Sequence, residues 1–134
     1  MAEWLTPKTN WVESDYINAS DYNRIKNNLQ YIYDRAIKIG KQFEIPTLGA
    51  DKIPGDLLYA EEMNNVELAL EIINSNTYLQ NIGVTVQFIE QGGFPNYVEL
   101  NRLERATLLI YELQDNALNN RRKFVWNFGL ESDF

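Results

Sequence analysis

The stretch INASDYNRI at residues 17–25 carries a complete start signal for an α-helix. Asn18 is a favoured N-cap residue, and Asp21 follows three positions later, where its carboxylate can reach back to the backbone N–H of the cap. An acidic residue at that place also favours the positive end of the helix dipole. Ile17 and Tyr22 have the spacing of a hydrophobic staple. The stretch therefore predicts a helix that begins at about residue 18.

Two later stretches repeat this pattern. Residues 58–66 read LYAEEMNNV, and residues 95–103 read PNYVELNRL. Aligning Asn23, Asn64 and Asn101 places the three copies 41 and 37 residues apart. A pattern that recurs at such a period indicates an internal repeat. We therefore expect three related helical units.

The three caps are not equally good. The third copy has Asn96 at the cap and Glu99 three positions later, which reproduces the first copy. The second copy has Tyr59 at the cap and Glu62 at the acidic position. Tyrosine is a poor N-cap because the favoured cap residues carry a short side chain with an oxygen acceptor. The second helix is therefore expected to begin within a residue or so of Tyr59.

Each start signal leads into apolar residues at the spacing of a helix. The three stripes are Tyr22, Ile25, Leu29, Ile32, Ala36 and Ile39; Met63, Val66, Leu70 and Ile73; and Leu100, Leu103, Ala106, Ile110, Leu113 and Ala117. Gly40 and the asparagine-rich residues 74–76 and 119–120 mark their ends. The patterns predict an all-α, three-helix bundle with helices at about residues 18–40, 59–75 and 96–119. Burial of the stripes against one another would hold it together.

The segments between the predicted helices differ in character. Residues 43–57 contain two prolines and two glycines, which excludes a helix throughout. In residues 77–94, Val84, Val86 and Phe88 alternate with more polar neighbours. This alternation allows one short strand pair, and a helical turn is the alternative.

Both ends of the chain are rich in aromatic residues. We divide the chain into an extended N-terminal arm at residues 1–16, the helical bundle at 17–120 and a C-terminal arm at 121–134. The candidate partner-interface residues are Trp4, Trp11, Tyr16, Phe124, Trp126, Phe128 and Phe134. Large aromatic side chains are costly to leave in water. Two interpretations stay open: the arms fold back on the bundle, or they dock on a neighbouring subunit, where Trp and Tyr are favoured anchors.

The matched residues Asn23, Asn64 and Asn101 have two possible roles. The first is a local hydrogen bond near the first helical turn or to the preceding loop. The second is a ligand-binding row across three helices. We favour the first, because amide side chains commonly satisfy nearby backbone groups.

The composition argues against catalysis and against metal or cofactor binding. The 134 residues include no cysteine and no histidine, which removes thiolate chemistry and the usual general base near neutral pH. No phosphate-binding loop, nucleophile elbow or calcium-loop pattern occurs. We therefore expect no enzyme, no catalytic residue, no metal and no cofactor.

The charge and hydropathy also limit the partners. The net charge of −7 opposes nucleic acid as the main partner, and the only basic cluster is RRK at residues 121–123. No apolar run is long enough to cross a membrane, and the first residues do not form a signal peptide.

The stretch WLTPKTNW at residues 4–11, followed by DYINASDYNRIKNNL at residues 15–29, resembles small structural proteins of tailed bacteriophages and prophages of Gram-positive bacteria. The resemblance covers about the first 35 residues. It implies a non-enzymatic virion component of the tail tip, baseplate or fibre-attachment region. Other virion structural proteins are then the expected partners, in a homo-oligomer or a larger assembly. The protein would be made in the host bacterial cytoplasm and carried in the virion.

Two alternative functions remain. A head–tail connector or adaptor protein is also helical and multimeric. A small cytoplasmic regulator that binds one partner protein would have the same lack of catalytic residues.

Overall fold

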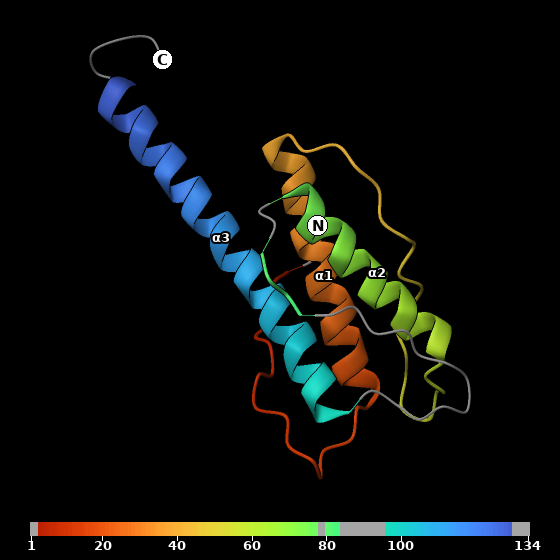
Figure 1. The fold of residues 1–134 in the computed structure, drawn as a ribbon. Coiled ribbons are helices and arrows are strands. Elements are labelled where there is room, and N and C mark those ends of the chain that lie inside the picture. The colour runs from red at the N-terminus through yellow and green to blue at the C-terminus, as the bar shows by residue number, and fades with distance from the viewer. Residues whose placement is uncertain (1–2, 78–79, 84–95, 130–134) are drawn as a thin grey trace.

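A computed structural model of the chain describes residues 3–77, 80–83 and 96–129, with side chains up to residue 119. It contains three helices, α1 (Ala19–Ile39), α2 (Ala60–Asn76) and α3 (Tyr97–Gly129), and no strand in the described residues (Figure 1). The prediction of an all-α, three-helix fold is confirmed.

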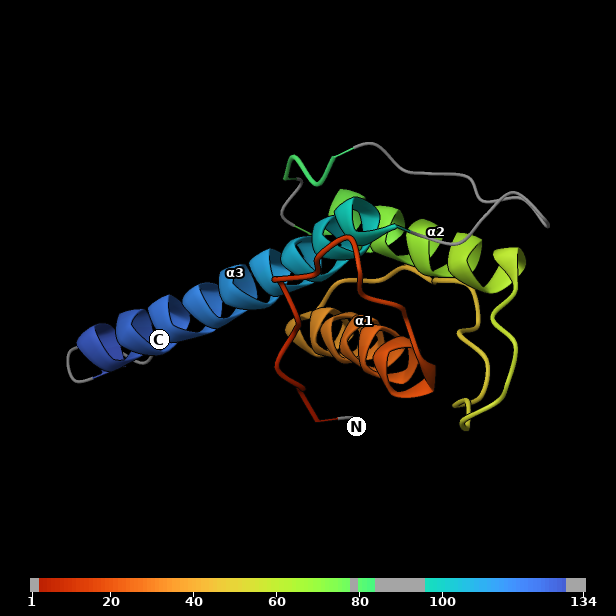
Figure 2. The same cartoon turned by 90° about the horizontal axis from the view of Figure 1, so that it is seen from below.

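The three helices all begin at the same end of the molecule, which is the lower end in Figure 1. They run in the same general direction, so the chain must return along the bundle between them. Viewed from below, the helices form a triangle (Figure 2). The N-terminal arm lies beside α3 and α1. The segment that connects α1 to α2 lies beside α1 and α2.

The predicted apolar stripes form most of the core, but Ile39, Leu113 and Ala117, at the ends of two stripes, are only partly buried. The largest side chains that are fully buried include Leu29, Ile32, Met63, Leu70, Ile73, Leu100, Leu103 and Ile110, from all three helices. Trp11 and Leu48 join this core from the extended segments. The core is therefore completed by parts of the chain that are not helical.

The predicted helix starts are also found. Asn18 and Asp21 form a capping box, with N···O distances of 2.9 and 3.0 Å, and Asn96 and Glu99 form a second one at 3.0 and 3.1 Å. In α2, the Glu62 carboxylate accepts the backbone N–H of Tyr59 at 2.9 Å. The acidic residues of all three units thus lie where the positive helix ends gather, and they offset that charge.

The predicted end of the third helix is wrong. The helix does not stop at residues 119–120 but continues to Gly129, so residues 121–129 of the predicted C-terminal arm are helical. Two asparagines lower helix stability by only about 0.7 kcal/mol each relative to alanine, and no glycine or proline follows them until Gly129. The possible strand pair at residues 84–88 lies outside the described residues.

Two leucines of α2 differ in how far they are buried, and this difference provides a test of the core packing. Leu70 is 0% exposed and Leu68, on the same helix, is 44% exposed. Leu70→Ala should lower the free energy of unfolding by about 2–5 kcal/mol because it leaves a cavity in the core. Leu68→Ala should change it by less than about 1 kcal/mol. Urea unfolding followed by circular dichroism measures both values, and equal losses would contradict the packing.

Candidate interaction surface

Trp11 attaches the N-terminal arm to the bundle. Its side chain is only 3% exposed, and its indole Nε1–H donates to Oε2 of Glu104 on α3 at 2.5 Å. The same carboxylate accepts the backbone N–H of Lys8 at 3.0 Å. Arg24 of α1 donates to its two oxygens from Nε and Nη2, at 2.7 and 2.9 Å. A single buried carboxylate therefore connects the arm, α1 and α3. We call this contact around Glu104 the buried joint.

The charge of this joint is balanced within the fold. Burial lowers the pKa of Arg24, but hydrogen bonds and attraction from Glu104 and Asp21 outweigh it and raise the pKa above its ordinary value. Arg24 stays charged, and Glu104 has a permanent counter-ion. Breaking such a buried pair is costly, because the remaining charge has no replacement partner.

The interface between α3 and α2 uses an arginine and a glutamate at the same two positions of the repeat. Arg102 of α3 binds the carboxylate of Glu67 on α2. Arg24 and Arg102 each directly follow one of the matched asparagines. Glu104 and Glu67 each lie three residues after the matched asparagine of their own unit. The repeat therefore includes a contact between helices, from α1 to α3 and from α3 to α2.

The third interface, between α2 and α1, departs from this pattern. The matched positions there hold Asn65 and Lys26. Lys26 binds the carboxylate of Asp51 and donates to the carbonyl of Gly49 at 3.1 Å. The buried cation of α1 is thus paired with the extended segment instead of with α2.

Asparagine side chains fasten the extended segments to the helices. The Asn101 amide accepts the backbone N–H of Trp11 at 2.8 Å and donates to its carbonyl at 2.9 Å. Asn23 makes the same pair of bonds with Lys52, both at 2.8 Å. A side-chain amide can satisfy one N–H and one C=O in this way, as a neighbouring strand would.

Asn23 and Asn101 make structural hydrogen bonds, but the prediction of a local partner in the first turn or the preceding loop is wrong, because both partners are distant in sequence. Asn23 contacts the segment before α2, and Asn101 contacts the segment before α1. Asn28 with Leu5 and Asn74 with Gln80 form equivalent pairs at 2.8 to 2.9 Å. We call these four pairs the amide clamps.

The turns before α1 and α2 are copies of each other. The backbone N–H of Val12 donates to the Asp15 carboxylate at 2.9 Å, and that of Ile53 donates to the Asp56 carboxylate at 2.8 Å. Both turns are closed by a backbone bond from the aspartate, at 2.9 and 3.0 Å. These residues are 41 positions apart, like the helix starts. The repeat therefore extends backwards from α1 and from α2, over a turn and into an extended segment.

Trp4 attaches the beginning of the arm. Its ring stacks on Tyr111 of α3, with centroids 4.0 Å apart and planes 8° from parallel, and Tyr31 of α1 lies 5.7 Å away. The guanidinium of Arg35 lies 4.9 Å from the Tyr111 ring and binds Asp115. Burial lowers the pKa of Arg35, but Asp115 outweighs it and the net pKa is raised.

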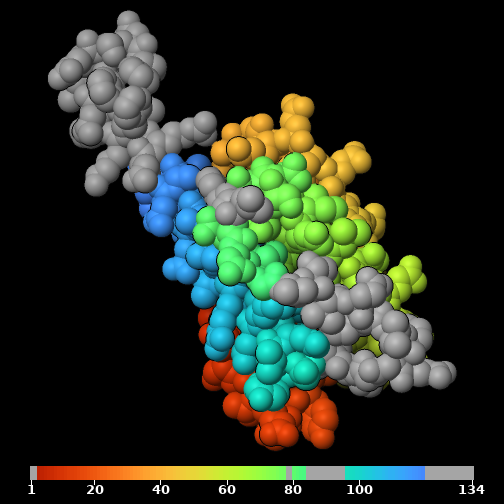
Figure 3. Space-filling model, viewed as in Figure 1, coloured from red at the N-terminus to blue at the C-terminus, as the bar shows by residue number. Residues whose placement is uncertain are grey.

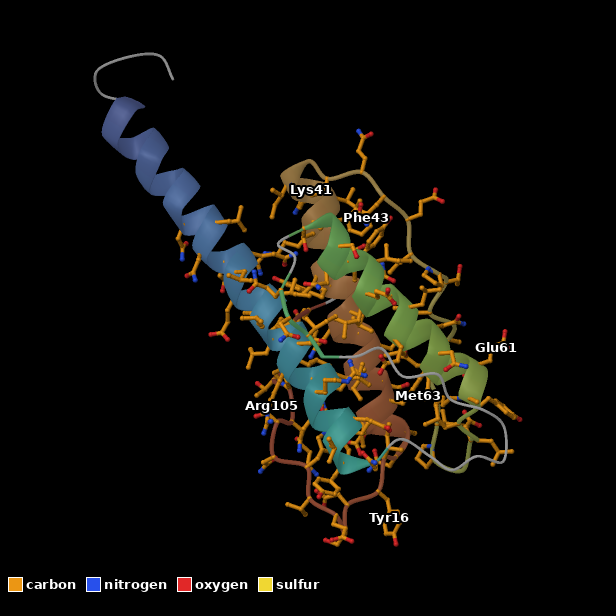
Figure 4. All side chains as sticks on the ribbon, viewed as in Figure 1. Tyr16, Lys41, Phe43, Glu61, Met63 and Arg105 are labelled. Carbon is orange, nitrogen blue, oxygen red and sulfur yellow. The ribbon has the colours of Figure 1, made fainter. Side chains whose placement is uncertain are left out.

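The predicted interface residues therefore have different surroundings. Trp4 and Trp11 face the helices of their own chain, so a partner cannot reach Trp11 while the arm is docked. Tyr16 is 88% exposed and points away from the bundle (Figure 4). Phe124, Trp126 and Phe128 belong to the last turns of α3, where side chains are not described, and Phe134 lies outside the described residues.

The described part of the chain has an open groove but no cluster of metal-binding side chains. Within it, no group of three acidic side chains could hold a metal ion. An open groove of about 450 Å³ is lined by Ile82, Arg102 and Leu109, among others, and it contains no acid–base pair. Burial, followed by the charges of Glu62 and Asp51, raises the pKa of Tyr22 to about 12, so this phenol keeps its proton near neutral pH.

Comparisons with known proteins do not identify the chain: no family model, curated protein or solved structure matches it. No helix among the described residues is long and apolar enough to cross a membrane.

The buried joint can be tested by a double-mutant cycle. Arg24→Leu should lower the free energy of unfolding by about 3–5 kcal/mol, because it leaves Glu104 charged and buried. Arg24→Leu combined with Glu104→Leu should lose less than the sum of the two single changes. Lys41→Leu, at an exposed lysine after α1, is the control and should cost about 0.5 kcal/mol or less. Additive losses in urea unfolding would show that the pair is not coupled.

Proposed function

We propose that the protein is a non-enzymatic structural component of a tailed-phage virion, placed in the tail tip, baseplate or fibre-attachment region. It acts by holding other virion proteins in position. The observation that carries this proposal is the distribution of its side chains. Charged and amide groups in the interior fasten the chain to itself, while large apolar side chains are exposed at one end.

The amide clamps and the arginine–glutamate pairs support the proposal that the protein is a rigid building block. Each non-helical segment, as far as the structure describes it, is held by at least one amide clamp. Two of the three helix interfaces contain a buried glutamate paired with an arginine. Such groups leave few alternative arrangements, because a misplaced segment would leave buried polar groups without partners. A constant shape is what an assembly component requires.

The residues that carry the phage resemblance support the same reading. Trp4, Trp11, Arg24 and Asn28 all lie in the joint between the arm, α1 and α3. The resemblance therefore concerns how a helical unit is packed, and not a reactive centre. This agrees with a sequence that lacks histidine and cysteine.

The decisive experiment is analysis of particles from the bacterium that encodes the chain. We expect mass spectrometry of purified virions to detect the protein, and gold-labelled antibodies to bind the end of the tail that is distant from the head. Disruption of the gene should give filled heads with tails that lack the tip structure.

Two results would contradict the proposal. Label at the junction of head and tail would make the protein a connector. Absence from purified virions, with the protein present in infected cells, would make it a cytoplasmic regulator.

A further inference from the structure

The exposed apolar side chains are concentrated at one end of the molecule. Among the described side chains, every large apolar residue with at least half of its surface exposed lies in a turn or helix start at the lower end: Val12, Tyr16, Ile53, Leu57, Tyr59 and Val98. We call these six residues the end surface. Tyr16 points outward there (Figure 4), and the N-terminal arm meets the start of α3 at the same end (Figure 3). Exposed apolar groups gathered in this way mark a contact surface.

The end surface has an acidic border. Residues 12–16, 51–62 and 96–99 contain seven acidic residues and one basic residue, Lys52. Ion pairs join Asp15 to Lys8, Asp51 to Lys26 and Glu62 to Lys52. The remaining acidic residues leave this end negative, so the matching partner is apolar and positively charged.

The opposite end of the chain has this composition. α3 has 33 residues, compared with 21 in α1 and 17 in α2, and it projects beyond both of them (Figure 1). Its last ten residues, 120–129, read NRRKFVWNFG. They include three cations, three aromatic residues and no acidic residue. We call this segment the α3 tip.

One molecule cannot bring these two ends together. α3 is a continuous helix about 50 Å long, at 1.5 Å per residue, that starts beside the end surface and points away from it. The α3 tip can therefore meet an end surface only on another copy. A contact between two different surfaces of identical chains is head-to-tail, and it leaves one of each surface free for a further copy.

We propose that the protein self-associates head-to-tail, with the α3 tip of one copy docked on the end surface of the next. Aromatic residues of the tip supply the apolar anchor, and the positive charge of residues 121–123 complements the acidic border. The proposal concerns the isolated protein and does not depend on a place in a virion.

The first test is sedimentation velocity of the full chain over a series of concentrations up to millimolar. We expect dimers and longer species to grow with concentration, and to weaken as salt is added because the contact contains opposite charges. Tyr16→Ser with Leu57→Ser should raise the apparent Kd for association about tenfold or more. Phe124→Ser with Trp126→Ser should have the same effect. Leu68→Ser, at an exposed leucine outside the end surface, should leave the Kd unchanged.

The second test mixes the two association-defective variants. The end-surface variant keeps an intact α3 tip, and the tip variant keeps an intact end surface. A head-to-tail contact therefore predicts that each variant alone is monomeric and that the mixture forms a 1:1 dimer and nothing larger. Circular dichroism checks that both variants remain helical.

Three results would overturn the proposal. The full chain could stay monomeric up to millimolar concentration. The Leu68→Ser control could weaken association as much as the end-surface variant does. The mixture of folded variants could fail to form the heterodimer, which would point to a symmetric contact. None of these results bears on whether the protein is found in virions, so the two proposals can fail separately.

Discussion

The amide clamp is the interaction on which the rest of the structure depends. Because α1 and α2 begin at the same end, the segment that joins them must run back along the bundle, and the structure describes it as extended. An extended segment has backbone N–H and C=O groups that no helix satisfies, and leaving them buried without partners is costly. Asn23 and Asn101 satisfy such groups at Lys52 and Trp11. Each clamp also fixes which residue of the segment lies beside which turn of the helix.

The amide clamps and the arginine–glutamate pairs join the three helical units into a closed bundle. The arm before α1 is held on α3, and the segment before α2 is held on α1. Arg24 and Glu104 join the same two helices as the arm does. The first unit is therefore fastened to the last without a covalent connection, and the chain closes on itself around a shared core. Each hydrogen bond contributes only about 1 kcal/mol to stability, so this device specifies position more than it supplies energy. The apolar stripes supply most of the energy.

The sequence predicted the parts of the fold that depend on neighbouring residues. Asn18 with Asp21 and Asn96 with Glu99 identified two helix starts, and the spacing of apolar residues identified the core. The extension of α3 to Gly129 was missed, because the two asparagines resemble a stop signal but cost little in a helix. The placement of Trp11 could not be predicted either, since it depends on Glu104, which lies 93 residues away. The 41-residue spacing of Asp15 and Asp56 was a usable signal that the repeat includes the turns.

Amide hydrogen exchange tests the clamps most directly. The backbone N–H groups of Trp11 and Lys52 lie outside the helices and are bonded to asparagine side chains. We expect both amides to exchange slowly by NMR, with opening free energies close to that of global unfolding. Asn23→Ala should release the amide of Lys52 while that of Trp11 stays protected. Exchange of both amides in the native protein at the rate of an unstructured peptide would contradict this account.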